Sequence, residues 1–130
     1  MLPRGDFVIV TVPETPETQG MFAAAQFASM KPSAFFINIG RGATVVLDDL
    51  VVALEGGRIA GAGLDVFQVE PLPVDYPLFA LDNVIVTSHL AWYTEEADAR
   101  LAAECMARTG ELLAGETPRN LKNREALGLS

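Results

Sequence analysis

Short apolar runs alternate with segments of helical composition along most of the chain. The runs FVIVTV and AFFINI are almost continuously apolar and rich in β-branched or aromatic residues. This pattern predicts strands that are buried on both faces, as in a parallel sheet. Two further segments are predicted as strands. Four strands are therefore expected, over residues 7–12, 34–39, 59–66 and 83–87.

Two helices are expected between these strands. The segment 21–30 is rich in Ala, Met and Phe, residues that suit a helix, and a Lys-Pro-Ser sequence ends it. The second helix opens at Asp48 or Asp49 and runs to about Glu55. Gly56-Gly57 follows it, and glycine is a common helix stop.

A longer helix follows the last strand. Thr94 is a suitable N-cap, and Glu95 and Glu96 place negative charge in the first turn, where the helix dipole favours it. The helix runs to about Ala114, and the tail from Glu116 is polar. The alternation of strands and helices predicts an α/β fold with a parallel sheet, right-handed crossovers, flanking helices and this long C-terminal helix.

Composition and charge exclude several classes of function. Half of the 130 residues are hydrophobic and 20% are charged, which is enough apolar material for a folded core. The net charge of −8 repels phosphate backbones, so we expect no nucleic-acid partner. One cysteine and one histidine exclude a disulfide framework and argue against a zinc site, so we expect no metal and a cytoplasmic location. No apolar run reaches the roughly 20 residues of a membrane span, and the start, MLPRGD, does not resemble a signal peptide.

Three polar residues stand just beyond the carboxyl ends of predicted strands: Arg41, Glu70 and His89. In open α/β sheets the ligand crevice lies at that edge. Arginine binds a carboxylate through two parallel hydrogen bonds, and histidine exchanges protons near neutral pH. Each residue also has a structural interpretation. Arg41 between two glycines is then a solvated turn, Glu70 before Pro71 an ordinary loop carboxylate, and His89 a structural histidine.

Four segments share their order, spacing and residue types with a known enzyme family. They are DFVIVTVPETPETQGMF from Asp6, MKPSAFFINIGRG from Met30, GRIAGAGLDVFQVEPLP from Gly57 and NVIVTSHLAWYTEEA from Asn83. Together they cover most of residues 6–97, and they resemble the D-2-hydroxyacid dehydrogenase family. The pattern His89-x-x-Trp92-Tyr93 and the later RNLKN resemble most closely the branch of the C-terminal-binding proteins and their bacterial relatives.

The resemblance implies an oxidoreductase that transfers a hydride between NAD(H) and a small 2-hydroxy or 2-oxo acid. It implies that His89 is the acid and base, that Arg41 binds the substrate and that Glu70 pairs with His89. Trp92 would close the substrate pocket, although core packing explains this residue equally well. Asp65 would meet the nicotinamide carboxamide or, alternatively, cap the end of its strand. The implied cofactor contacts are Val12, Pro13, Thr18, Ile39, Gly40, Arg41, Asp65, His89 and Ala91.

The family's phosphate-binding loop, G-x-G-x-x-G, does not occur in the sequence. The resemblance therefore implies a partial Rossmann-like fold. Residues 1–96 are expected to form the C-terminal half of a dinucleotide-binding domain, and residues 97–130 a helix and tail that pack on a substrate domain. We expect this chain alone to bind NAD weakly. We also expect it to form a homodimer through an apolar strand edge and helix face.

Three hypotheses stay open at the level of sequence. The chain is the catalytic half of a dehydrogenase, a non-catalytic NAD-regulated binding protein of the C-terminal-binding-protein kind, or an inactive truncated paralogue. Ser88, where the family usually has proline, and Val46, where an acidic residue is common, depart from the family pattern without removing a catalytic group. The particular 2-oxo acid and the choice between NAD and NADP stay open as well.

Overall fold

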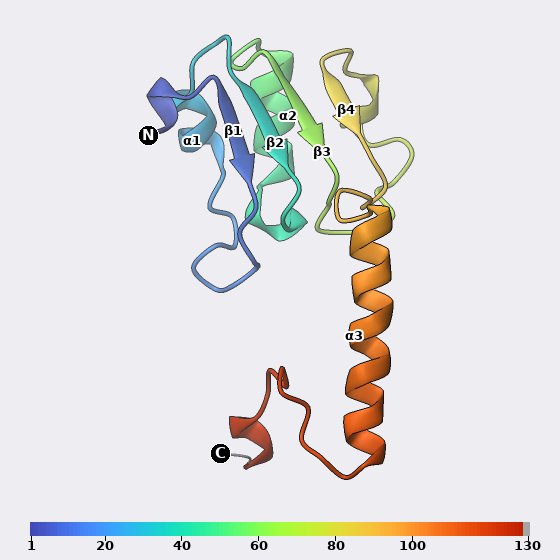
Figure 1. Cartoon of the computed structure of the whole chain (residues 1–130). Helices are drawn as coiled ribbons and strands as arrows, with labels where there is room; N and C mark the ends of the chain where they lie inside the picture. The colour runs from blue at the N-terminus through green and yellow to red at the C-terminus, as the bar shows by residue number, and fades with distance from the viewer. Residues whose placement is uncertain (129–130) are drawn as a thin grey trace. The chain divides into compact units, whose positions relative to one another are not determined.

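The computed structural model of the chain describes residues 1–128. The chain divides into two compact units, with the boundary between Ala91 and Trp92. The first unit holds a parallel sheet with its helices, and the second holds one long helix and the segment after it (Figure 1). The expected division by role into 1–96 and 97–130 stays a prediction, and its residues 129–130 lie outside the described residues.

Four parallel strands form one sheet in the order β1-β2-β3-β4 (Figure 1). Their number and the α/β class are confirmed. Each strand is shorter than the apolar run that predicts it, because residues at the ends of the run leave the ladder for turns and loops. The bounds are β1 (Phe7–Val10), β2 (Phe35–Asn38), β3 (Gly61–Leu64) and β4 (Val84–Val86).

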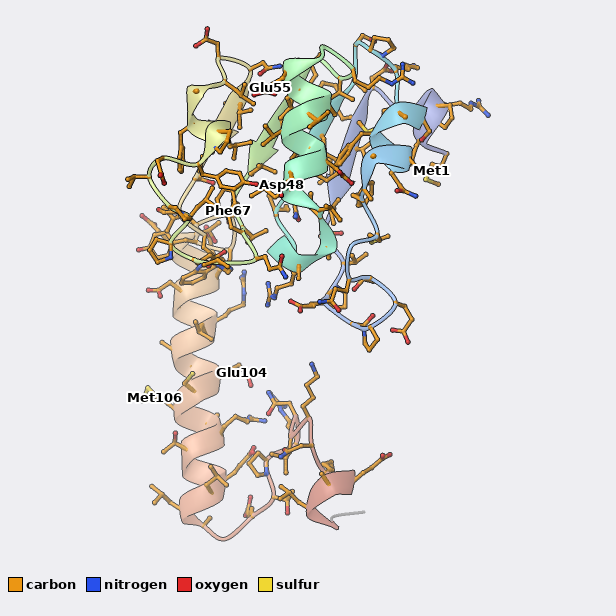
Figure 2. All side chains as sticks on the ribbon, turned by 180° about the vertical axis from the view of Figure 1, so that it is seen from behind. Met1, Asp48, Glu55, Phe67, Glu104 and Met106 are labelled. Atoms are coloured by element: carbon orange, nitrogen blue, oxygen red, sulfur yellow. The ribbon has the colours of Figure 1, made fainter. Side chains whose placement is uncertain are left out.

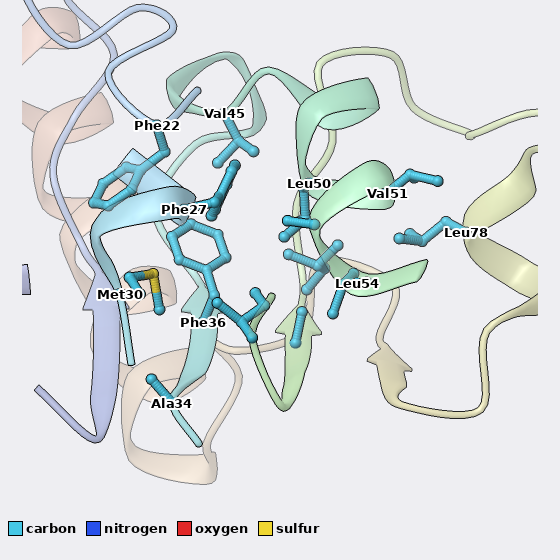
Figure 3. Packing of buried hydrophobic residues seen from close by; sticks show 14 of the residues in the cluster. Phe22, Phe27, Met30, Ala34, Phe36, Val45, Leu50, Val51, Leu54 and Leu78 are labelled. Atoms are coloured by element: carbon cyan, nitrogen blue, oxygen red, sulfur yellow. The ribbon is translucent and has the colours of Figure 1, made fainter. Parts of the chain in front are cut away.

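Helices α1 (Ala24–Ser29) and α2 (Leu47–Glu55) cover one face of the sheet. Phe27 of α1 and Leu50 of α2 are fully buried in one cluster with Phe36 of β2 (Figure 3). The rings of Phe27 and Phe36 meet edge to face, with their centroids 5.2 Å apart. Short 3-10 helices complete the described elements: η1 (Leu2–Arg4), η2 (Gly42–Thr44), η3 (Pro77–Ala80) and η4 (Glu125–Leu127).

The opposite face of the sheet is open, so the prediction of strands buried on both faces is wrong. Phe7, Ile9 and Ile85 are 64%, 56% and 72% exposed. The strand order explains the difference. Successive strands step in one direction across the sheet, and right-handed connections then all fall on the same face. Within residues 1–91, no helix covers the apolar side chains of the other face.

The first helix begins later than expected, because Phe22 pairs with the chain ahead of α2. Phe22 N–H donates to the carbonyl of Thr44 (3.0 Å), and Val46 N–H donates to the carbonyl of Phe22 (2.9 Å). Asp49 also differs from its prediction. It lies inside the first turn of α2, and its carboxylate accepts the backbone N–H of Ala24 at the start of α1 (2.8 Å). One aspartate therefore links the amino-terminal ends of both helices.

The second unit holds α3 (Glu95–Leu113), the long helix that the sequence predicts. The hydroxyl of Thr94 accepts the N–H of Ala97 at 3.0 Å, which confirms Thr94 as the N-cap. None of the side chains of α3 is buried, and Glu104 and Met106 project from it (Figure 2). In the part of the chain that the structure describes, no helix has the length and apolar character needed to cross a bilayer.

Candidate active site

A polar cavity of about 430 Å³ lies among the loops that follow the strands. Arg41 comes from the loop after β2, Glu70 from the loop after β3 and His89 from the loop after β4. The structure thus brings together the three residues that the resemblance implies as catalytic and that follow the ends of strands. Glu14 and Gln68 line the same cavity. Sequence reasoning missed both, although each lies in a segment that carries the family resemblance.

A second cavity, of about 680 Å³, shares Glu70 and His89 with the first. Apolar side chains, including Leu72, Phe79 and Val86, contribute to its walls. The two ionisable residues therefore border both a polar and an apolar space. A small organic acid, which is polar at one end and carbon-rich at the other, suits such surroundings.

His89 and Glu70 form a hydrogen-bonded pair. Nδ1 of the imidazole lies 2.9 Å from Oε2 of the carboxylate, and the other carboxylate oxygen accepts the N–H of Phe67 at 2.8 Å. The bond to His89 and then the bond from Phe67 lower the pKa of Glu70 below its ordinary value. With Glu70 ionised, Nδ1 must carry the proton that it donates. Among the described residues no group bonds Nε2, so this atom is available to a ligand.

Asp65 forms hydrogen bonds with the backbone of the loop that carries His89. Asp65 is 4% exposed, and its carboxylate accepts the hydroxyl of Thr87 and the N–H groups of Leu90 and Ala91, the last two at 2.8 Å. Its carbonyl accepts the N–H of His89 at 2.9 Å, and His89 adopts a left-handed φ of 60°. Burial alone would raise the pKa of Asp65, but the three hydrogen bonds lower it overall. This geometry fits the strand-end cap, and the nicotinamide contact stays a prediction.

Replacing Asp65 with asparagine should destabilise the chain at neutral pH and much less in acid. Asparagine presents an NH₂ group to one of the donors, and the loss of one charge-assisted hydrogen bond costs about 1.5–3 kcal/mol. Because folding lowers the pKa of Asp65, its ionised form stabilises the fold above the ordinary value of 3.8. That contribution is lost as the pH falls through the lowered value.

Urea unfolding followed by circular dichroism at pH 7 and pH 3 measures the effect of this substitution. The difference in the free energy of unfolding between the two chains should shrink at pH 3. The same difference at both pH values would contradict this account of Asp65.

Arg41 presents a cation that no carboxylate among residues 1–128 neutralises. Its Nη1 donates to the carbonyl of Gly40 at 2.7 Å. In the described residues no carboxylate pairs with it, although Glu14 and Glu70 line the same cavity. Glu70 is already engaged by His89. The remaining guanidinium N–H groups are therefore available to an anionic ligand.

Five of the nine expected cofactor contacts fall into two groups. Val12, Ile39 and Gly40 meet at the carboxyl edge of the sheet, since a Cβ at Gly40 would lie 2.9 Å from the carbonyl oxygen of Val12. Thr18 instead serves its own turn, where its hydroxyl donates to the carbonyl of Pro13 at 2.8 Å. Ala91 contributes the N–H that Asp65 accepts, as described above. The structure therefore gives Thr18 and Ala91 structural bonds and leaves their cofactor contacts as predictions.

Trp92 belongs to the second unit of the chain. It is 49% exposed, and its ring meets that of Tyr93 edge to face with centroids 5.3 Å apart. This packing is local, and the expected role in closing a substrate pocket stays a prediction. No cluster of three or more potential metal ligands occurs among residues 1–128.

Comparison with known proteins identifies relatives along nearly the whole chain. Residues 1–91 match the family described as D-isomer specific 2-hydroxyacid dehydrogenase, NAD binding domain. The chain is 44% identical over 128 residues to glyoxylate/hydroxypyruvate reductase B of Citrobacter koseri. It is 46% identical over 127 residues to the protein of that name from Pectobacterium carotovorum subsp. carotovorum. Each match covers 98% of this chain, and the chain spans about 40% of the length of these curated relatives.

Solved structures agree with the fold. The D-isomer specific 2-hydroxyacid dehydrogenase from Xanthobacter autotrophicus Py2 has a TM-score of 0.80 at 44% identity, over 92% of this chain and 39% of that chain. The NAD complexed form of the enzyme from Lactobacillus delbrueckii ssp. bulgaricus has a TM-score of 0.80 at 34% identity, over 92% and 40%. By sequence and by fold, this chain belongs to the D-isomer specific 2-hydroxyacid dehydrogenase family.

Proposed function

We propose that this chain carries the catalytic residues of a nicotinamide-dependent reductase, which converts a small 2-oxo acid into the D-2-hydroxy acid. One observation carries the proposal. Arg41, which no described carboxylate neutralises, lines the same cavity as the hydrogen-bonded pair of Glu70 and His89. The relatives named glyoxylate/hydroxypyruvate reductase B support glyoxylate and hydroxypyruvate as the substrates.

His89 is the residue suited to exchange a proton with the substrate oxygen. Reduction of a ketone places negative charge on that oxygen, and an acid must neutralise it. Glu70 holds Nδ1 at 2.9 Å and balances the charge of a protonated ring, so Nε2 is the atom that gives up the proton. In the reverse direction the same nitrogen accepts the proton from the alcohol.

Arg41 is the residue suited to hold the carboxylate of the substrate. Its planar guanidinium binds a carboxylate through two parallel hydrogen bonds, which fixes the orientation of the adjacent carbonyl group. A bound nicotinamide supplies the hydride that this carbonyl carbon receives. Arg41 and His89 therefore act on the carboxylate and on the neighbouring carbonyl oxygen of the same substrate.

The loops after β1 and β2 fit the nicotinamide end of a dinucleotide. Gly40 lets the two loops lie in direct contact, and Ile39 beside it is 42% exposed. Val12, Pro13 and Ile39 are the proposed contacts of the nicotinamide. The sequence contains no G-x-G-x-x-G loop to hold the pyrophosphate. The proposal therefore includes weak binding of NAD by this chain alone.

A homodimer and a cytoplasmic location are further parts of the proposal. The open apolar face of the sheet supports the homodimer, as do exposed apolar side chains of α3 such as Met106 and Leu113. Light scattering tests it, and a mass equal to one chain would contradict it. The single cysteine supports the cytoplasm. NAD is the proposed cofactor, and solved relatives hold NAD in one case and NADPH in another.

The non-catalytic binding protein is a second candidate function. The pattern His89-x-x-Trp92-Tyr93 favours it, because this pattern resembles the C-terminal-binding-protein branch. An inactive paralogue is a third. Both alternatives predict a protein that does not turn over 2-oxo acids, whatever its affinity for a dinucleotide.

A chimera separates these possibilities. In the reductase of Citrobacter koseri, the stretch that matches this chain is replaced by this chain, so that the relative supplies the rest of the fold. We expect the chimera to oxidise NADH or NADPH in the presence of glyoxylate or hydroxypyruvate, with the unmodified relative as the positive control. A chimera that binds the dinucleotide but oxidises it with neither acid would contradict the proposal and favour the alternatives.

A further inference from the structure

Asn38 and Thr44 are polar residues with no exposed surface. Asn38 ends β2 on the side that faces the helices, where the alternation with Phe36 favours an apolar side chain. A buried amide or hydroxyl is unfavourable unless it is hydrogen-bonded. The partners of these two side chains therefore indicate what they do.

The hydrogen bonds of both residues converge on the backbone carbonyl oxygen of Arg41. Nδ2 of Asn38 donates to it at 3.1 Å, the hydroxyl of Thr44 at 2.6 Å and the N–H of Thr44 at 3.2 Å. The side-chain oxygen of Asn38 accepts the N–H of Gly40 at 3.1 Å. The carbonyl of Gly40 in turn accepts Nη1 of Arg41 at 2.7 Å. The network thus extends from the buried amide to the guanidinium itself.

The same loop is packed against the loop that carries Glu70. A Cβ at Gly42 would lie 1.9 Å from the carbonyl carbon of Phe67, so the two backbones are in direct contact. The N–H of Phe67 donates to Glu70, and Glu70 bonds His89. Anchoring the backbone of Arg41 therefore also fixes it relative to the residues that hold the imidazole.

We propose that Asn38 and Thr44 are positioning residues, which hold the guanidinium of Arg41 where it can bind the carboxylate of a 2-oxo acid. This inference rests on the proposed function of Arg41. Neither side chain touches the substrate. Their loss leaves the charge of Arg41 in place and releases its position, so substrate binding weakens more than the proton transfer at His89 does.

The test uses the active chimera with Thr44→Val, which has the same shape without the hydroxyl, and Asn38→Asp, which lacks the amide donor. We expect each to raise the KM for hydroxypyruvate about tenfold to hundredfold. The turnover number should change less, and the dissociation constant of the dinucleotide should not change. Thr44→Ser, which keeps the hydroxyl, should restore the KM. Thr109→Val is the matched control, because the hydroxyl of Thr109 also donates to a backbone carbonyl, on α3 at 2.8 Å.

Arg41→Lys in the chimera separates failure of this inference from failure of the proposed function. If Arg41→Lys raises the KM and Thr44→Val does not, the proposed function stands and the positioning role is wrong. If Arg41→Lys leaves the KM unchanged, the role of Arg41 itself is wrong. Thr44→Val could instead raise the KM and lower turnover and dinucleotide affinity by similar factors, with no rescue by serine. That result would overturn the positioning role in favour of a general role in folding.

A second measurement does not depend on turnover. In the 130-residue chain, nuclear magnetic resonance of the side-chain Nε–H of Arg41 reports how rigidly the guanidinium is held. We expect a lower order parameter in Thr44→Val and Asn38→Asp than in the natural chain, and no change in Thr109→Val. An unchanged order parameter in both site variants would overturn the proposal, even if the chimera did not fold.

Discussion

Replacing His89 with glutamine should lower the turnover of the chimera by about two to four orders of magnitude, the usual contribution of a positioned acid. Glutamine is similar in size to histidine, but it cannot give a proton to the substrate oxygen. The chain contains no second histidine to take over this task. Steady-state kinetics with NADH and hydroxypyruvate measure the change.

The affinity for the dinucleotide is the control for His89→Gln. It should change little, because His89, although one of the expected cofactor contacts, is proposed to act on the substrate more than on the cofactor. Turnover that falls less than about tenfold, with folding intact, would mean that another group supplies the proton.

Replacing Gly42 with alanine should lower the free energy of unfolding of the 130-residue chain by about 3 kcal/mol, the upper part of the range for overpacked sites. The added Cβ would lie 1.9 Å from the carbonyl carbon of Phe67 and 2.3 Å from the N of Gln68. These are backbone atoms, which cannot rotate away as a side chain would. The loops that carry Arg41 and Glu70 must therefore separate.

Gly63→Ala is the matched control for Gly42→Ala. A Cβ at Gly63 would meet only side-chain atoms of Ile37, at 3.8 Å and 3.9 Å, which is ordinary van der Waals contact. Urea unfolding followed by circular dichroism compares the two substitutions. Equal and small effects would show that the contact between the two loops is looser than the structure indicates.

The order of strands and helices could be predicted because each element carries its own local signal. Thr94 is a good example, since a threonine followed by two glutamates defines a helix start without reference to the rest of the fold. The start of α1 could not be predicted in this way. The residues next to Phe22 are typical of a helix, but Phe22 pairs with Val45, which is distant in sequence. Non-local pairing overrode the local propensity.

Burial was harder to predict than secondary structure. The run FVIVTV predicts a strand covered on both sides, yet Phe7 and Ile9 face the open side of the sheet. An apolar run shows that both faces of a strand are able to pack against other segments. The run does not show which segment covers each face, and here helices α1 and α2 lie on the same face.

The site was predictable at Arg41, Glu70 and His89, where the family resemblance and a position beyond a strand end agree. Asn38 and Thr44 were missed because nothing in the sequence shows that their side chains bond the backbone carbonyl of Arg41. A signal was nevertheless present, since a lone asparagine in the apolar run AFFINI is costly to bury without partners. Asp65, by contrast, was singled out from the sequence. The resemblance implies a ligand contact, and the structure adds a set of loop hydrogen bonds.

Transfer of deuterium tests the central claim most directly. The chimera is supplied with hydroxypyruvate and a reduced nicotinamide cofactor that carries deuterium at both C4 positions, and the product is examined by mass spectrometry and chiral chromatography. The account predicts D-glycerate with deuterium at C2, formed by the chimera and lost in His89→Gln. Product of the L configuration, product without deuterium at C2, or the same yield from His89→Gln would contradict it.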